Sequence, residues 1–310
     1  MKNNNSGKIN QTNDIKESKA IRRNPKLTRS EQIERTLITG YRKKIWNRFL
    51  EAINEYHMIA DGDKIAVCIS GGKDSMLLAK CFQELKAHGK FNFDVEYLVM
   101  NPGYAEENRQ RIIENAKLLN IPITMFETHV FEHVEKIEKH PCFICAKMRR
   151  GHLYRKAKEL GCNKIALGHH FDDVVETILI GLFYGAQYQT MMPKVKSTYH
   201  EGMELIRPLY LVREQDILSW VKKNELEFIN CACKITKKGV DDANASKRAE
   251  VKQLVAELKK KYKNIDVNIF RSAQGVSLDT VLSYKLEGVE HNFLDDYYTR
   301  KRNIQNNENN

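Results

Sequence analysis

Residues 64–75 read KIAVCISGGKDS, an apolar run followed by two glycines, a lysine, an aspartate and a serine. The apolar run predicts a short buried strand, and a helix is expected from residue 73 to about residue 88. The two glycines let the backbone turn tightly and come close to a ligand, because they carry no Cβ atom. Successive amide groups and the helix N-terminus would then face an anion. The stretch therefore predicts a phosphate-binding loop at the end of a strand.

The side chains of this loop, residues 70–75, suit a phosphate group. Lys73 adds a full positive charge, and Ser70 and Ser75 add hydroxyl groups. Asp74 can help to hold a magnesium ion. The loop lacks the four-residue spacer of a Walker motif and the third glycine of a dinucleotide fingerprint. A plain strand-to-helix turn is the alternative, but the complete six-residue string after a strand favours the phosphate site.

The order of elements around the loop predicts the fold class. This order is an alternation of strands and helices, which predicts an α/β fold built on a doubly wound parallel sheet with helices on both faces. Ligands bind such sheets beyond the carboxyl ends of the strands. The chemistry is therefore expected just after Ile69, Met100 and Leu167. The expected strands are 64–70, 95–100, 123–126 and 164–168, and the expected helices are 73–88, 105–119, 146–160, 172–184 and 214–223.

The two ends of the chain differ from this central part. Residues 30–57 carry apolar side chains at a four-residue repeat and predict one long amphipathic helix with a basic side. A further helix, with a lysine-rich face, is expected after residue 242. We predict four segments: a disordered basic tail at 1–28, an N-terminal helix at 29–60, a nucleotide-binding ATPase domain with a cysteine site at 61–265, and a C-terminal extension with a polar tail at 266–310.

Composition argues against a membrane-spanning protein and against a secreted one. The 310 residues include 51 Lys and Arg against 40 Asp and Glu, a formal net charge of +11. The longest uncharged stretch, residues 177–193, is too short and too polar to span a bilayer, and the start has no apolar signal region. We therefore expect a cytoplasmic protein with no membrane partner. The positive charge is compatible with a polyanion such as RNA.

Four of the seven cysteines lie in two close pairs, Cys142 with Cys145 and Cys231 with Cys233. Thiolates this close in sequence can bind one metal ion or one cluster. Three alternatives are open from the spacing: a structural zinc site, an iron–sulfur cluster held by three thiols, and a redox dithiol. The odd cysteine count argues against a disulfide scaffold. The other three cysteines are expected to be inert core residues: Cys68, Cys81 and Cys162.

The loop and four further segments together resemble the tRNA 2-thiocytidine synthetases, a branch of the PP-loop ATP pyrophosphatase superfamily. The resemblance runs from about residue 35 to about residue 265. It implies the doubly wound PP-loop fold and an ATP- and Mg²⁺-dependent enzyme that forms AMP and pyrophosphate. The four segments are CFICAKMRRG at 142–151, ALGHHFDD at 166–173, FYG and MPK within 183–194, and IRPL and RE within 206–214.

The resemblance also implies the substrate and the partners. Sulfur would replace the C2 oxygen of cytidine 32 in a tRNA anticodon loop. A [4Fe–4S] cluster on three cysteines would be required, together with a cysteine desulfurase or another sulfur donor. Candidate tRNA contacts are the basic tail, the basic side of residues 30–57 and the lysines at 259–263, although a charge run is more often a solvated face. The oligomeric state is open, with a homodimer as one alternative.

The loop, the strand ends and the resemblance together predict which residues form the functional site. Asp172 has a second interpretation as a helix cap, and Arg149 and Arg150 have one as a solvated helix face. The expected nucleotide-binding residues are Ser70, Gly71, Gly72, Lys73, Asp74, Ser75, Gly168 and His169. The expected catalytic residues are Lys73, Asp74, Arg150, Asp172 and Asp173. The expected cluster ligands are Cys142, Cys145 and, from the second pair, Cys233 in preference to Cys231.

Two other functions compete with this reading. The first is a different PP-loop enzyme acting on tRNA, a lysidine synthetase or a 2-thiouridine synthetase, although the former has no use for the cysteine pairs. The second is a non-catalytic nucleotide-binding module that has kept the loop. Iron and sulfide analysis tests the first alternative, since a protein without iron would argue against the cluster. Conversion of ATP to AMP and pyrophosphate only with tRNA would argue against the second.

Overall fold

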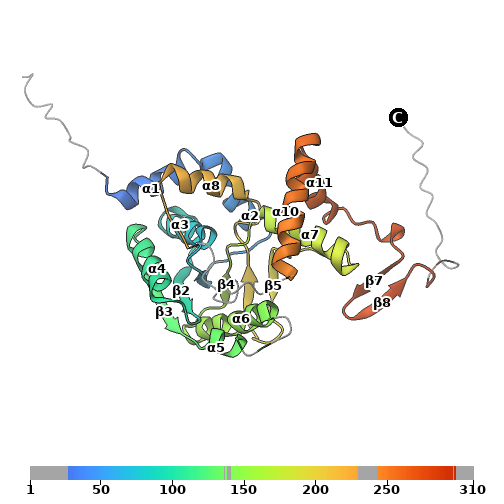
Figure 1. Cartoon of the computed structure of the whole chain (residues 1–310), viewed down its shortest axis with the longest axis horizontal. Coiled ribbons are helices and arrows are strands. Elements are labelled where there is room, and N and C mark those ends of the chain that lie inside the picture. Colours follow the sequence, from blue (N-terminus) through green and yellow to red (C-terminus); the bar gives the residue numbers. More distant parts are fainter. Residues whose placement is uncertain (1–26, 136, 138–140, 230–242, 296, 298–310) are drawn as a thin grey trace, which may run out of the picture.

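A six-stranded sheet lies at the centre of the computed structural model, which describes residues 27–135, 137, 141–229, 243–295 and 297 (Figure 1). Its strands are β1 (Lys64–Ile69), β2 (Asp94–Asn101), β3 (Ile123–Glu127), β4 (Lys164–Ala166), β5 (Lys194–Lys196) and β6 (Glu204–Ile206). The strand order is β3-β2-β1-β4-β6-β5, and only β5 runs antiparallel to its neighbour. From β1 the chain adds β2 and then β3 on one side of β1, and it then crosses to add β4 on the other side of β1. This confirms the predicted doubly wound α/β fold and puts the switch point between β1 and β4.

Helices cover both faces of the sheet. Side chains of β1 alternate between the faces, so that Ile65 and Val67 join the larger core and Ala66 and Cys68 join the smaller one. Helix α6 covers the smaller core through residues such as Tyr154, and α3 packs on the other face. The helices here are α3 (Lys73–His88), α4 (Glu106–Leu118), α5 (Val130–Val134), α6 (Pro141–Glu159), α7 (Phe171–Gly185), α8 (Glu214–Lys223), α10 (Ala243–Lys261) and α11 (Ile265–Ser272).

The N-terminal amphipathic segment is not one continuous helix. It consists of α1 (Arg29–Ile38), a turn that contains Gly40, the π-helical turn η1 (Arg42–Trp46) and α2 (Asn47–Glu55). Its predicted apolar side is buried, with Ile33, Leu37 and Phe49 fully covered. A strict four-residue repeat drifts around a helix of 3.6 residues per turn, so a straight helix could not keep it on one face. The wider π turn restores the direction of the stripe.

Several short elements differ from the expectations. Helix α6 begins at Pro141 rather than at residue 146, so the backbone of Cys142 and Cys145 lies in its first turns. The three-residue strands β5 and β6 and helix α11 had no counterpart among the predicted elements. Beyond α11 follow the 3₁₀ turn η2 (Leu278–Thr280) and a hairpin of β7 (Ser283–Leu286) and β8 (Val289–Asn292). The four-segment division of the chain stays a prediction.

The three cysteines expected in the core are buried there, namely Cys68, Cys81 and Cys162. Burial raises the pKa of the Cys68 thiol to about 12 and that of the Cys162 thiol to about 11, so both are protonated and unreactive at neutral pH. Within the described part of the chain, no helix has both the length and the apolar character needed to cross a membrane.

Candidate functional site

The predicted phosphate loop joins β1 to α3 and is tied together by its own serines. Gly71 has a φ of +86°, a left-handed conformation that favours glycine, and a Cβ atom there would lie 2.6 Å from a carbon of Ile112. The Ser75 hydroxyl accepts a hydrogen bond from the Ser70 amide at 3.1 Å and donates one to the Gly72 carbonyl at 2.9 Å. Gly72 caps α3 without a side chain, which leaves the first amides of that helix to a ligand.

A cavity of about 290 Å³ opens beside this loop at the carboxyl ends of the strands. Ile69, Met100 and Leu167 line it, as expected from the ends of β1, β2 and β4. Gly168 lets the end of β4 come close to the loop, because a Cβ atom there would lie 3.1 Å from the Ser75 amide nitrogen. The other lining residues are Cys68, Ser70, Asp74, Ser75, Arg149, Leu153, Gly168, His169 and Asp173.

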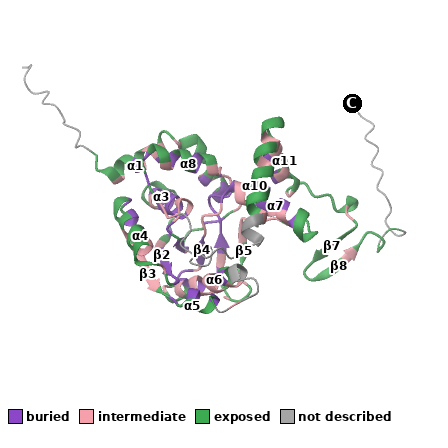
Figure 2. Ribbon diagram, in the orientation of Figure 1, coloured by how far each residue is buried: buried purple, intermediate pink, exposed green. Residues whose placement is uncertain are grey.

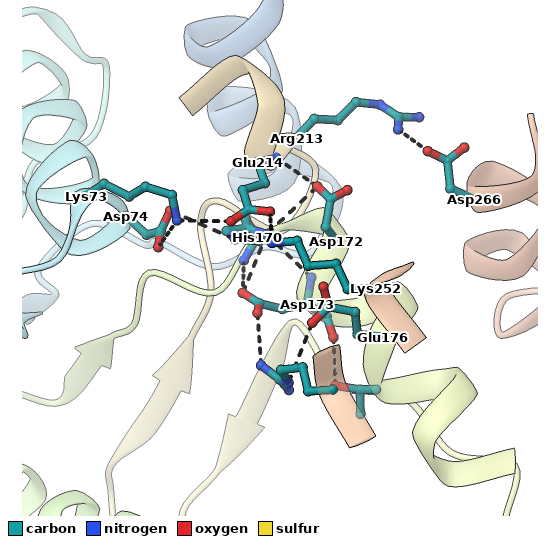
Figure 3. A network of polar contacts seen from close by, with 12 residues as sticks. Lys73, Asp74, His170, Asp172, Asp173, Glu176, Arg213, Glu214, Lys252 and Asp266 are labelled. Carbon is teal, nitrogen blue, oxygen red and sulfur yellow. Dashed lines mark hydrogen bonds and ion pairs between the residues drawn. The ribbon is translucent and has the colours of Figure 1, made fainter. Parts of the chain in front are cut away.

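Lys73 lies between two carboxylates (Figure 3). Its Nζ is 3.0 Å from Asp74 Oδ2 and 3.2 Å from Glu214 Oε1 at the start of α8. Burial opposes the charge on Lys73, but Asp74 and Glu214 outweigh it and raise the pKa of Lys73 above its ordinary value. The other oxygen of Glu214 accepts a hydrogen bond from Lys252 on α10. The loop, α8 and α10 therefore meet through one partly buried glutamate.

The two aspartates at the start of α7 have different partners. His170 is the N-cap of this helix, and its backbone amide donates to Asp173 Oδ2 at 3.0 Å in a reciprocal capping box. Asp172 instead accepts a hydrogen bond from the backbone amide of Glu214 at 2.7 Å. Asp172 thus joins the start of α7 to the start of α8, and neither aspartate is itself the N-cap. Of the two, Asp173 lines the cavity.

Arg248 of α10 neutralises two carboxylates of α7. Its Nη1 lies 3.1 Å from Asp173 Oδ1, and its Nε lies 3.5 Å from Glu176 Oε2 (Figure 3 draws this network). The Glu176 side chain is only 8% exposed. Burial raises the pKa of Glu176 to about 7, and the charge on nearby Asp173 adds to this effect while Arg248 opposes it. Glu176 is therefore partly protonated at neutral pH.

His169 is a neutral group at the wall of the cavity. Burial and the nearby charge of Arg207 lower the pKa of His169 to about 4. Its buried Nδ1 atom has no hydrogen-bond partner among the described residues, and the same holds for Oδ1 of Asp74. His170 Nε2 lies 3.9 Å from this oxygen, too far for a hydrogen bond. A bound ligand or ion that reaches His169 Nδ1 and Asp74 Oδ1 would relieve the cost of their burial.

Helix α6 connects the cavity with the first cysteine pair. Arg149 and Leu153 line the cavity, whereas Arg150 is exposed and is not among the lining residues. Cys145 is 8% exposed and packs with Val130, Phe131 and Val134 of α5. The side chain of Cys142 and the whole of Cys231 and Cys233 lie outside the described residues. Among the residues that are described, no group of three metal-binding side chains occurs.

The site contains residues that the sequence patterns did not indicate, namely Glu176, Arg248 and the carboxylate of Glu214. Glu214 follows the loop by more than a hundred residues, and only a known fold could have paired it with Lys73. Lys259 was among the lysines expected to contact RNA, but it pairs with Asp266 inside the chain, and Lys252 of the same helix pairs with Glu214.

Comparison with known proteins agrees with this geometry. The family described as the PP-loop domain matches residues 41–237. The tRNA-cytidine(32) 2-sulfurtransferase of Paraburkholderia xenovorans (strain LB400) is 34% identical over 266 residues, which cover 84% of this chain and 76% of that protein. The enzyme of the same name from Coxiella burnetii (strain Dugway 5J108-111) is 32% identical over 250 residues, which cover 79% of this chain and 94% of that protein.

A solved structure shares the fold. The U34-tRNA thiolase NcsA from Methanococcus maripaludis, solved with its [4Fe–4S] cluster, superposes with a TM-score of 0.56 at 19% sequence identity. The match covers 79% of this chain and 78% of the thiolase. At this level of identity the likeness shows the common fold alone.

Proposed function

Because the chain belongs to the PP-loop family, and within it to the tRNA-cytidine(32) 2-sulfurtransferases, we propose that the cavity beside residues 70–75 activates a tRNA cytidine for 2-thiolation. ATP is consumed, and sulfur replaces the C2 oxygen of cytidine 32. The observation that carries this proposal is the shared wall of the cavity. Asp74 and Ser75 of the phosphate loop face the same space as Arg149 of the cysteine-bearing helix α6.

The loop is suited to the pyrophosphate portion of ATP. The free amides at the start of α3 and the charge of Lys73 meet the β- and γ-phosphates, which is mainly electrostatic stabilisation. Gly168 lets the end of β4 pack closely against the backbone of the loop, and both line the cavity proposed for the nucleotide. Asp74 and Glu214 hold Lys73 in place until phosphate oxygens take over its hydrogen bonds.

A magnesium ion fits beside Asp74. Oδ1 of Asp74 is a buried carboxylate oxygen without a hydrogen-bond partner among the described residues, and oxygen ligands are what Mg²⁺ prefers. The ion would neutralise charge on the departing pyrophosphate. Asp173, which also lines the cavity, is the second carboxylate within this space.

The first chemical step transfers AMP to the base. The C2 oxygen of the cytidine attacks the α-phosphorus, the bond to the β-phosphate oxygen breaks, and pyrophosphate leaves. Arg149 faces the cavity and can stabilise negative charge on the α-phosphoryl group, while neutral His169 offers a hydrogen bond without adding charge. In the second step sulfur bonds to C2, and the bond from C2 to the activated oxygen breaks. AMP leaves with that oxygen.

The cluster proposal rests on the spacing of the cysteines. Cys142 and Cys145 are three residues apart in α6, a spacing that puts two positions on one side of a helix, and the Cys145 side chain is buried against α5. A [4Fe–4S] cluster held by three thiolates keeps one iron available for exogenous sulfur. Cys233, or Cys231 in its place, would be the third ligand. A cysteine desulfurase is the expected donor.

Iron and sulfide analysis of anaerobically purified protein tests the cysteine assignment. Cys142→Ala and Cys145→Ala are expected to lose iron, and comparing Cys231→Ala with Cys233→Ala identifies the third ligand. Cys162→Ala is the matched control, because Cys162 is a buried core thiol and should leave the iron content unchanged. An iron-free wild-type protein with full activity would refute the cluster.

The end of α10 and part of the N-terminal segment are candidate tRNA contacts. Lys44 pairs with Asp216 and Arg48 with Glu51, whereas Arg35, Arg42 and Lys43 are exposed and have no ion pair to a described residue. Lys260 and Lys261 are exposed, and no ion pair to a described residue occupies them. We assign the phosphate contacts to these two lysines. The target base must leave its stack to reach the cavity, as in other enzymes that act on bases.

Turnover assays test the function directly. The chain should convert ATP to AMP and pyrophosphate only when tRNA is present. Binding of ATP without turnover, under anaerobic conditions with a sulfur donor, would favour a non-catalytic nucleotide-binding module. A cytoplasmic location stays a prediction from the sequence.

A further inference from the structure

Arg207 is a buried cation that the described part of the chain does not neutralise. It follows β6 directly and is only 7% exposed, and the strands around it are buried, as Figure 2 shows for β2 and β4. Its guanidinium donates to the backbone carbonyl of Met192, while its Nε atom is buried and has no hydrogen-bond partner. No described carboxylate forms an ion pair with it. A buried charge of this kind destabilises a protein unless an anion compensates it.

A second arginine lies near Arg207 on helix α6. Leu205, two residues before Arg207, belongs to the smaller core that α6 covers. Side chains two positions apart share one face of a strand, so Arg207 lies on the α6 side of the sheet. Arg150 of α6 is exposed and also has no ion pair to a described carboxylate. Burial and the like charge of Arg150 lower the pKa of Arg207 to about 10, so both groups of this arginine pair are charged at neutral pH.

The groups around the arginine pair do not cancel its charge. The carboxylate of Asp173 acts on the buried guanidinium more weakly than the like charge does, and it is already paired with Arg248 at 3.1 Å. Tyr154 and Tyr210 are neutral at pH 7, since burial raises the pKa of both hydroxyls. Two neighbouring guanidinium groups with so little compensation indicate a site for an anion, and a phosphate matches their hydrogen-bonding geometry.

The arginine pair is separate from the phosphate loop. Strand β6 lies two strands away from β1, which is about 10 Å at the usual strand spacing. Neither arginine lines the cavity beside the loop, whereas Arg149 does. Successive side chains on a helix point about 100° apart, so α6 offers one arginine to the cavity and the next to its outside. Burial and the charge of Arg207 lower the pKa of His169 in the cavity wall, so the arginine pair borders the cavity from outside.

We propose that Arg150 and Arg207 hold the RNA phosphodiester next to cytidine 32 while its base occupies the cavity. An extruded nucleotide puts its base into a pocket and leaves its backbone phosphates outside. An arginine pair at the outside of the cavity meets this backbone and fixes the position of the base without reading the sequence. The contact is additional to those of Lys260 and Lys261. The inference rests on the proposed function, because it takes tRNA as the substrate.

Affinity for a synthetic anticodon stem-loop tests the arginine pair in the anaerobically purified full chain. Arg150→Gln should weaken binding of the stem-loop about tenfold, the effect of losing one charge-assisted hydrogen bond, and should leave the affinity for ATP unchanged. The matched control is Arg155→Gln, which removes the same charge from the same helix at a different cavity, beside His129 and His133. That control should lose much less affinity. Equal losses in the two variants would reveal a general electrostatic effect and overturn the proposal.

A chemical change in the RNA identifies the phosphate. An uncharged methylphosphonate can replace the phosphodiester on the 5′ side or on the 3′ side of cytidine 32. At one of these two positions the replacement should weaken binding to the wild-type chain about tenfold and cause no further loss with Arg150→Gln. Fully additive losses at both positions would contradict a contact between this arginine and either phosphate.

Arg207→Gln separates binding from structure. It should lower the affinity for the stem-loop as Arg150→Gln does, but the Tm should not fall, because the substitution removes an uncompensated buried charge. A lower Tm with normal stem-loop affinity would give Arg207 a structural role. A loss of ATP affinity with normal stem-loop affinity would assign a nucleotide phosphate to the site. Either result overturns the proposal.

Thiolation of the stem-loop distinguishes this contact from the proposed function. A wild-type chain that neither binds nor thiolates the stem-loop would refute the proposed function and the contact together. A wild-type chain that binds and thiolates it, with no loss of affinity in Arg150→Gln, would leave the proposed function intact and overturn the arginine pair alone.

Discussion

Lys73 illustrates how single residues of the site are prepared for a ligand. Two carboxylates, from α3 and from the start of α8, hold its ammonium group at 3.0 and 3.2 Å, and one of them, Asp74, lines the cavity, so the charge is already fixed beside the cavity before any phosphate arrives. Preorganised charge of this kind is what stabilises a leaving pyrophosphate. The loop amides supply the remaining donors at fixed positions.

Replacing Lys73 tests this role. Lys73→Met should lower the tRNA-dependent formation of AMP by about 10²–10³-fold, the usual effect of removing one preorganised donor. Affinity for tRNA should not change. The matched control is Lys86→Met on the same helix, since Lys86 is 45% exposed and its partners, Asp94 and Phe93, do not line the cavity. Equal losses in the two variants would show that the effect is structural.

Glu176 gives stability a predictable dependence on pH. Its pKa is about 7 in the folded chain against an ordinary 4.5 in the unfolded chain, so folding takes up a proton between these values. The free energy of unfolding contributed by this group is fully present below 4.5 and is lost as the pH rises through about 7. Denaturant titrations measure the free energy of unfolding, which should fall between about pH 5 and about pH 8 in the wild type. In Glu176→Gln this fall should be smaller by about 1–3 kcal/mol. An identical fall in both proteins would contradict the raised pKa.

At the scale of elements, helix α10 has two functions in two parts of its length. Arg248 and Lys252 are partly exposed but pair with Asp173, Glu176 and Glu214 at the site, while Lys260 and Lys261 are exposed at its end. The helix is therefore both a structural support of the ATP site and a candidate RNA contact.

Two double variants separate these functions. Arg248→Gln with Lys252→Gln should lower the free energy of unfolding by about 1–3 kcal/mol, because buried carboxylates lose their partners. Lys260→Gln with Lys261→Gln should change stability by less than about 0.5 kcal/mol but weaken tRNA binding and reduce its dependence on salt. Thermal unfolding and tRNA titrations at several salt concentrations measure both effects. The proposed roles would be contradicted if Arg248→Gln with Lys252→Gln left the free energy of unfolding unchanged. They would also be contradicted if Lys260→Gln with Lys261→Gln bound tRNA normally.

The elements that could be predicted from sequence are those with a long local pattern. Helices α3 and α8 have the predicted limits, and the buried strand β1 ends where the glycine pair begins. The three-residue strands β5 and β6 are too short to show a period, and β5 exists because it pairs with Leu205 and its neighbours. The break near Gly40 follows from tertiary packing, which keeps the apolar stripe buried at the expense of a straight helix.

The same distinction applies to the site. The lining residues Ser70, Asp74, Ser75, Gly168 and His169 could be placed because they follow strands in a fold whose ligands bind at that edge of the sheet. Glu214, Arg248 and Glu176 could not, because their roles depend on which distant helix crosses the loop. Arg149 rather than Arg150 faces the cavity, a difference set by the rotation of α6 that the pair of arginines does not reveal.

At the scale of the whole molecule, charge and cysteines divide among separate tasks. Part of the positive charge is used in ion pairs within the chain, and the exposed remainder is available to tRNA. Cys68, Cys81 and Cys162 belong to the core, and the two close pairs are the cysteines that we propose as the source of the cluster ligands.

Nucleoside mass spectrometry of tRNA tests the central claim most directly. In the source organism, deletion of the gene should abolish 2-thiocytidine, and the wild-type gene should restore it while the Lys73→Met variant should not. Unchanged 2-thiocytidine at position 32 after deletion would contradict the assignment of this chain as the tRNA-cytidine(32) 2-sulfurtransferase.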